Sequence, residues 1–146
     1  MKKKYEARTG APFKTEQAQQ FGERLEYVTN QHNGNLTPEA VVDDGKNVSS
    51  PFHTYFEWDD KKASKEFRLQ QARNLINHVV EVVVIEGKQS TQRSFFNVTN
   101  GGGNKVYVTL NKALTTNKYR TQTLNQLITI LENATELIKL FKSYEK

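Results

Sequence analysis

The chain contains no cysteine, one tryptophan and three prolines. Without cysteine it forms neither disulfides nor thiolate metal sites, and a reducing cytoplasm is its natural setting. Its longest apolar run, Val79–Ile85, is interrupted by Glu81 and is far too short to cross a bilayer. The initial Met-Lys-Lys-Lys is not followed by the apolar core of a signal peptide. These absences predict a soluble, cytoplasmic protein with no membrane partner.

The net charge of +5 is distributed unevenly along the 146 residues. Residues 1–14 hold five bases and one acid, residues 15–60 hold nine acids and two bases, and residues 61–146 hold fourteen bases and six acids. A basic arm, an acidic middle and a basic remainder favour an anionic partner that binds only to the basic surfaces of the protein. The alternative is that these charges serve only solubility.

The predicted fold class is α+β, with an N-terminal helical part, a three-stranded antiparallel sheet and a long C-terminal helix. Apolar residues make up 36% of the chain, which is low for a globular protein but above the disordered range. We expect a flexible basic arm over residues 1–14 and a single domain over residues 15–146. Within that domain we expect the helical part at 15–80, the sheet at 81–110 and the C-terminal helix at 111–146.

Three segments carry signals for the start of a helix. Thr15 is the predicted N-cap of a helix that ends near Asn30. Thr37-Pro38-Glu39 is a stronger start, because Thr accepts from free amides, Pro suits the first helical position and Glu complements the helix dipole. Asp59 or Asp60 is expected to cap a long helix that runs to about Val80.

Three segments rich in Val, Phe and Tyr predict β-strands. They are Glu81–Ile85, Arg93–Thr99 and Lys105–Leu110, and the glycine-rich Asn100–Asn104 joins the last two as a hairpin. A final helix is predicted from about Thr116.

The helix expected after Trp58 has a stripe that changes from basic to apolar. At about 100° per residue, Lys61, Lys65 and Arg68 fall on the same stripe as Ala72 and Leu75. Such a helix, docked at its C-terminal half, would project a basic end toward phosphates, as helix-turn-helix proteins do. About fifteen residues separate it from the Pro38–Asp43 helix, far more than a standard turn has. The alternative is a solvated helix end. The candidate nucleic-acid-binding residues are Lys2, Lys3, Lys4, Arg8, Lys61, Lys62, Lys65, Arg68 and Arg73.

The aromatic cluster Phe52, Tyr55, Phe56 and Trp58 is interpreted as core. It could instead form a base-stacking platform, but Glu57, Asp59 and Asp60 lie beside it and would repel phosphate.

Catalysis, cofactors and metal are not expected. The three histidines lack metal-site spacing, and helix capping explains Asp59 and Asp60 better than cation binding does. Gly101-Gly102-Gly103 precedes a strand, so it is not a phosphate loop. We therefore predict a protein that is not an enzyme.

The C-terminal helix is apolar over more than one side, which favours a homo-oligomer. Ile130, Leu137, Leu140 and Tyr144 widen its face. The alternative is that the N-terminal helices pack on both sides of it. The candidate oligomerisation residues are Leu124, Leu127, Ile128, Leu131, Ile138 and Phe141.

The segment Leu36–Ile76 contains the most specific pattern of the chain. It includes Leu-Thr-Pro-Glu-Ala-Val-Val from Leu36, Phe-Glu-Trp-Asp-Asp from Phe56, and Gln-Ala-Arg from Gln71. This pattern resembles a family of small phage and prophage proteins that has no settled biochemical activity. The resemblance extends from about Phe21 to Tyr144. The chain departs from it with Phe52 in place of Leu and with Lys62-Ala63 in place of Ala-Ala.

Two functions follow as hypotheses, both in the cytoplasm of a host cell. The first is a non-enzymatic phage or prophage accessory protein that binds nucleic acid, most simply DNA, through its basic arm and basic helix end. The second is a protein-interaction or virion-assembly component that uses the acidic surface and the long C-terminal helix to bind phage or host protein.

Overall fold

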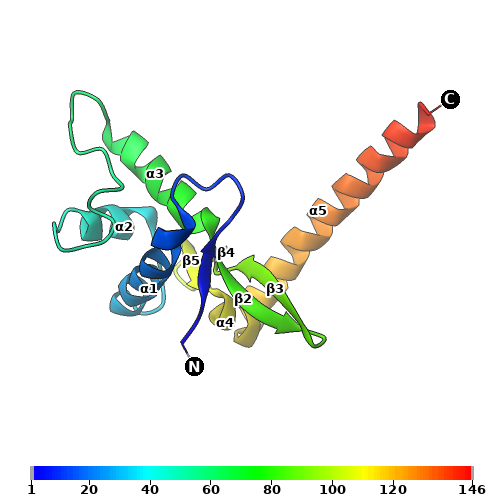
Figure 1. Cartoon of the computed structure of the whole chain (residues 1–146). Helices are drawn as coiled ribbons and strands as arrows, with labels where there is room; N and C mark the ends of the chain where they lie inside the picture. Colours follow the sequence, from blue (N-terminus) through cyan, green and yellow to red (C-terminus); the bar gives the residue numbers. More distant parts are fainter. Residues whose placement is uncertain (1, 146) are drawn as a thin grey trace. The chain divides into compact units, whose positions relative to one another are not determined.

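The order of strands and helices confirms the predicted α+β class (Figure 1). The structure is a computed structural model that describes residues 2–145, and it divides into two units, Met1–Leu110 and Asn111–Lys146. In chain order the elements of the described residues are β1 (Tyr5–Ala7), α1 (Thr15–Gln31), α2 (Pro38–Gly45), α3 (Lys65–His78), β2 (Val79–Ile85), β3 (Lys88–Arg93), β4 (Phe95–Thr99), β5 (Lys105–Thr109), α4 (Leu110–Thr115) and α5 (Asn117–Ser143).

Helix α1 begins one residue earlier than predicted, because Lys14 and not Thr15 is its N-cap. The amide of Lys14 donates to Gln17 Oε1 at 3.1 Å, which satisfies a backbone donor at the helix start. Apolar residues at helical spacing then form the buried face of the helix. They are Ala18, Phe21, Leu25 and Val28.

Helix α2 begins as predicted. Thr37 Oγ1 accepts from the amide of Ala40 at 3.1 Å, and Pro38 occupies the first turn. Just before this cap, the amide and carbonyl of Leu36 form a two-way bridge to Tyr107 of β5, with N···O distances of 2.8 and 2.7 Å. The start of α2 is therefore held against the β4–β5 hairpin.

Helix α3 begins later than predicted, at Lys65, so the expectation that Asp59 or Asp60 caps it is wrong. The carbonyl of Asp59 instead closes a turn by accepting from the amides of Lys62 and Ala63, both at 2.9 Å. Ser64 follows in an extended conformation, and its hydroxyl accepts from Phe67 N at 3.3 Å. Ser64 therefore caps α3.

The N-terminal arm is not wholly flexible, because Tyr5–Ala7 form strand β1 at one edge of the three-stranded sheet β1-β2-β3. Tyr5 pairs with Glu81 of β2 in an antiparallel register. The Tyr5 ring also packs on α1 at Gly22, where it leaves no space for a Cβ atom. A side chain at position 22 would thus push β1 away from α1.

The three predicted strand segments all form strands, namely β2, β4 and β5, and a three-stranded antiparallel sheet is present, but of the three only β2 belongs to it. Strand β3 is polar and exposed, and a two-residue turn at Glu86 and Gly87 joins it to β2. Both turn residues have positive φ, 52° and 79°, as a type I′ hairpin requires. Strands β4 and β5 form a separate two-stranded sheet, joined by the predicted glycine-rich hairpin.

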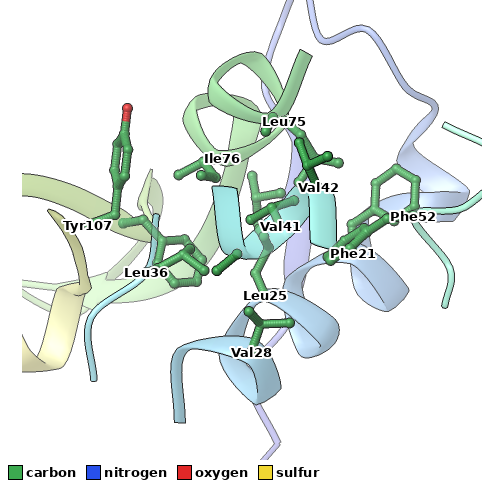
Figure 2. Packing of buried hydrophobic residues seen from close by; sticks show 14 of the residues in the cluster. Phe21, Leu25, Val28, Leu36, Val41, Val42, Phe52, Leu75, Ile76 and Tyr107 are labelled. Carbon is green, nitrogen blue, oxygen red and sulfur yellow. The ribbon is translucent and has the colours of Figure 1, made fainter. Parts of the chain in front are cut away.

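One hydrophobic core joins the helices to the sheets in the first unit. Figure 2 shows side chains from α1, α2, α3 and the aromatic segment converging on it. Phe21 is almost fully buried in it and contacts the rings of Phe13 and Phe52 at centroid distances of 5.1 and 5.7 Å. Tyr55 and Trp58 are partly buried against the same cluster. The interpretation of the aromatic segment as core is therefore confirmed.

The second unit consists of α4 and α5. The final helix begins after its N-cap Thr116, close to the predicted start, and the break at this residue separates it from α4. No residue of α5 is buried.

Glu81 gives the first unit a pH-dependent weak point. Only 7% of this residue is exposed, and its Oε2 has no hydrogen-bond donor among residues 2–145. Burial raises the pKa of the Glu81 carboxyl, the positive charge of Lys3 and the nearby Ser94 hydroxyl partly offset this shift, and the negative charge of Glu26 adds to it. The folded protein thus holds the Glu81 proton at a pH where the unfolded chain has lost it.

We expect Glu81→Gln to raise the melting temperature at neutral pH. For an acid with a raised pKa, stability falls as pH rises from the ordinary value of 4.5 through the folded pKa. The advantage of the variant should accordingly be full at neutral pH and disappear below about pH 4.5. Thermal unfolding between pH 3 and 8 measures it, with the exposed Glu86→Gln as the matched control. An advantage that is independent of pH would contradict the burial argument.

Candidate interaction surfaces

The lysines of the N-terminal arm are paired with carboxylates of the same unit. The pairs are Lys2 with Glu23 at 2.8 Å, Lys3 with Glu26 at 3.3 Å, and Lys4 with Glu6 at 3.7 Å. Hydrogen bonds from Lys2 and then from Gln19 lower the pKa of Glu23. Glu26 also accepts from the Tyr5 hydroxyl at 2.6 Å. Carboxylates of the same unit therefore neutralise the three lysines at the start of the arm.

The acidic middle of the sequence is also partly neutralised. Five of its nine acids form ion pairs: Glu23, Glu26, Asp43, Asp44 and Asp60. One of these pairs is bidentate, from Arg24 Nε and Nη2 to the two oxygens of Asp44 at 2.9 and 2.8 Å. Ser50 Oγ donates to the same carboxylate at 2.7 Å. This pair joins α1, α2 and the start of the aromatic segment.

Arg68 holds the segment that precedes α3. Its guanidinium donates to the carbonyls of Glu57 and Trp58 at 2.9 and 3.3 Å, and it pairs with the carboxylate of Asp60. The Arg68 side chain is only 14% exposed and lies over the Trp58 ring at 5.5 Å. A guanidinium committed to three acceptors is badly placed to bind phosphate.

Trp58 is also held by His53. The indole N–H donates to the His53 carbonyl at 2.7 Å, and the two rings stack with centroids 5.6 Å apart. Because the ring contacts His53 and Arg68 and its N–H has an acceptor, Trp58 acts as a packing residue and not as an open stacking platform.

The predicted basic helix end does not form as one stripe. Lys61 and Lys62 lie in the turn before α3, so they do not share a helix with Arg68. Lys61, Lys62 and Lys65 are exposed. The long connection from α2 to α3 also lacks the short turn of a helix-turn-helix unit.

The remaining candidate bases are Arg73 and Arg8. Arg73 pairs with Glu66 at 3.1 Å along α3. Arg8 follows β1, where its amide donates to the His78 carbonyl at 2.9 Å and its side chain is exposed. Five of the nine predicted bases are therefore paired with carboxylates: Lys2, Lys3, Lys4, Arg68 and Arg73.

Nδ1 of each of the three histidines lies within hydrogen-bond distance of a backbone carbonyl oxygen. The acceptors are Val28 for His32, Gly45 for His53 and Asn74 for His78, at 2.6 to 2.9 Å. Among the described residues no cluster of His, Asp or Glu side chains is arranged to hold a metal ion.

Helix α5 and its C-cap carry most of the large apolar side chains that are exposed among the described residues. The six predicted oligomerisation residues are all half-exposed or more, from 50% for Leu124 and Ile128 to 70% for Phe141. Ile130, Leu137 and Leu140 of the same helix and Tyr144 at its C-cap are 54% to 79% exposed. Within the described part of the second unit, only the six-residue α4 accompanies α5. Nothing within this unit therefore covers the apolar face of α5.

Sequence reasoning missed Arg68 as an anchor of the loop and Tyr5 as the contact between β1 and α1. Neither residue has a local signal, because its partners lie elsewhere in the chain. The Leu36–Ile76 segment contains Trp58, Asp60 and Arg68, which are the two ends of the Arg68 contact. They could have suggested such a pair.

No protein-family model, curated protein or solved structure matches the chain. In the described part of the chain, no helix combines the length and the apolar character that a membrane span requires.

Replacing Arg68 with Lys should loosen the segment before α3. Lysine keeps the charge but lacks the planar fork that reaches two carbonyls and a carboxylate at once. We expect a loss of about 1–3 kcal/mol in the free energy of unfolding and a red shift in the fluorescence of Trp58, the only tryptophan. Arg73→Lys is the matched control and should change neither. If the two variants behave alike, Arg68 is not an anchor.

Proposed function

We propose that the protein is a non-enzymatic assembly component of a phage or prophage, and that it joins protein chains through the apolar face of α5. The exposed apolar face carries this proposal. Ten large apolar side chains on one 27-residue helix and its C-cap are at least half exposed, and an exposed surface of this kind marks an interaction site. Most of the stability of a helix in a protein comes from packing of its apolar face, so a partner that covers the face of α5 would also stabilise the helix.

The distribution of charge supports a protein partner over a nucleic acid. Lys2, Lys3, Lys4 and Arg68 have carboxylate partners, so fewer free cations remain than the net charge suggests. The apolar face of α5, in contrast, has no element in its own unit that would cover it.

Association through α5 should be lost in Leu131→Asp, because a carboxylate in the middle of the apolar face cannot be buried without a partner. Light scattering at tens of micromolar should show an oligomer for the wild type and a monomer for this variant. Thr129→Asp is the matched control, because Thr129 lies on the polar side of α5. This variant should stay oligomeric.

Trp58 fluorescence checks that the first unit remains folded in both variants. A wild-type protein that is monomeric under these conditions would contradict the proposed function.

Nucleic-acid binding is a second candidate, favoured by the exposed Lys61, Lys62 and Lys65. These three lysines lie within five residues, and none forms an ion pair at 4 Å or less among the described residues. Lysines that are free of carboxylates are the ones that neutralise phosphate and release counterions.

The triple variant Lys61, Lys62 and Lys65→Gln should then reduce the log–log salt slope of duplex DNA binding by about 2–3 units. Replacing Lys2, Lys3 and Lys4 with Gln removes the same charge from lysines that are already paired, and should reduce the slope less. Filter binding between 50 and 200 mM salt measures both. Equal slopes for the wild type and the first variant would exclude these lysines from a DNA interface.

A further inference from the structure

The apolar residues of α5 and its C-cap are arranged symmetrically about Ala134. Positions three, four, six, seven and ten residues away from Ala134 are apolar in both directions, and no other position between 124 and 144 carries a large apolar side chain. The symmetric pairs are Leu131 and Leu137, Ile130 and Ile138, Ile128 and Leu140, Leu127 and Phe141, and Leu124 and Tyr144. The apolar pattern is therefore the same in both chain directions.

Ala134 also marks the centre line of the apolar face. At about 100° per residue, Leu127 and Phe141 lie within about 20° of Ala134, and Ile130 and Ile138 within about 40°. The residue at the centre is the smallest of the set. A small residue at that point lets a second helix approach closely, because helix separation depends on the side chains at the contact.

We propose that α5 pairs with α5 of a second copy in an antiparallel, two-fold symmetric arrangement that crosses at Ala134. This inference rests on the proposed function and names the partner and its orientation. When a second α5 is turned end to end about Ala134, each large apolar residue lies level with an apolar residue of the second copy. Leu127 then lies level with Phe141 of the second copy, and Leu131 with its Leu137. The same patch serves on both chains, as two-fold symmetry requires.

The charges at the two ends of α5 favour the antiparallel orientation. Arg120, near the start of the helix, lies within about 40° of the centre line of the face, and Glu145 directly follows the C-cap Tyr144. In the antiparallel pair the C-terminal end of the second copy, with its Glu145, comes near Thr123, about one turn from Arg120. A parallel pair would instead place Arg120 beside Arg120 and Glu145 beside Glu145.

Arg120 has donors available for this contact. Its guanidinium donates to the Leu114 carbonyl at 3.1 Å and to Asn117 Oδ1 at 2.6 Å, and a guanidinium carries five N–H groups. The charged residues in the middle of α5 do not oppose pairing. Glu136 and Lys139 form an ion pair at 3.0 Å on the polar side of the helix, where they stay in solvent.

Single cysteines test the orientation directly, because the natural chain has none. Thr123→Cys and Glu145→Cys are made separately in the full chain, one with an affinity tag, and are oxidised in a glutathione buffer alone and as an equal mixture. We expect the mixture to give a disulfide-linked heterodimer as the main product, while each variant alone stays largely uncrosslinked. Leu127→Cys mixed with Phe141→Cys should behave in the same way. Ala134→Cys should crosslink with itself.

The outcomes separate this inference from the proposed function. If light scattering shows an oligomer but each of the end variants crosslinks with itself, the helices are parallel, and the orientation is wrong while the assembly function stands. If Ala134→Cys fails to crosslink in an intact oligomer, the crossing point is wrong. If the wild type is monomeric, both the inference and the proposed function are overturned.

Discussion

The contact of the Tyr5 ring with Gly22 sets the arrangement of the first unit. Because position 22 has no side chain, β1 can lie directly on α1 while its backbone pairs with β2. This position brings Lys2 and Lys3 to the glutamates of α1 and buries Glu81 on the neighbouring strand. Burial raises the pKa of the Tyr5 hydroxyl, and the hydrogen bond to Glu26 raises it further, so the phenol stays neutral at physiological pH.

The alternating basic and acidic segments of the chain therefore pair mainly with each other. A basic arm and an acidic helix that meet in the fold neutralise each other, and the sequence alone cannot distinguish this from two surfaces that await separate partners. Most of these pairs are exposed and contribute little stability each. The bidentate pair of Arg24 and Asp44 is the exception, since it is more buried and also holds Ser50. The net charge of +5 is therefore weak evidence for an anionic partner.

Features with local causes could be predicted from the sequence, and features with distant causes could not. Thr37 and Pro38 mark the start of α2 within four residues, and the apolar spacing of α1 and α5 gives their faces directly. Strand β3 has no apolar residue, because it is an exposed edge strand, so its composition does not indicate a strand. The candidate site divides in the same way: the face of α5 follows from its own residues, whereas the role of Arg68 depends on two carbonyls ten and eleven residues away and a carboxylate eight residues away.

The two units differ in how much of their apolar surface they bury. The first unit buries its aromatic residues in one core, while α5 leaves its leucines and isoleucines at least half exposed. Full burial of one such side chain is worth about 1.5–3 kcal/mol, so covering several of them would add substantially to the stability of the long helix. In an antiparallel pair, the residues near the line through Ala134 would be covered. Ile128 and Leu140, about 120° from that line, would stay at its edges, and their burial is what a larger assembly would add.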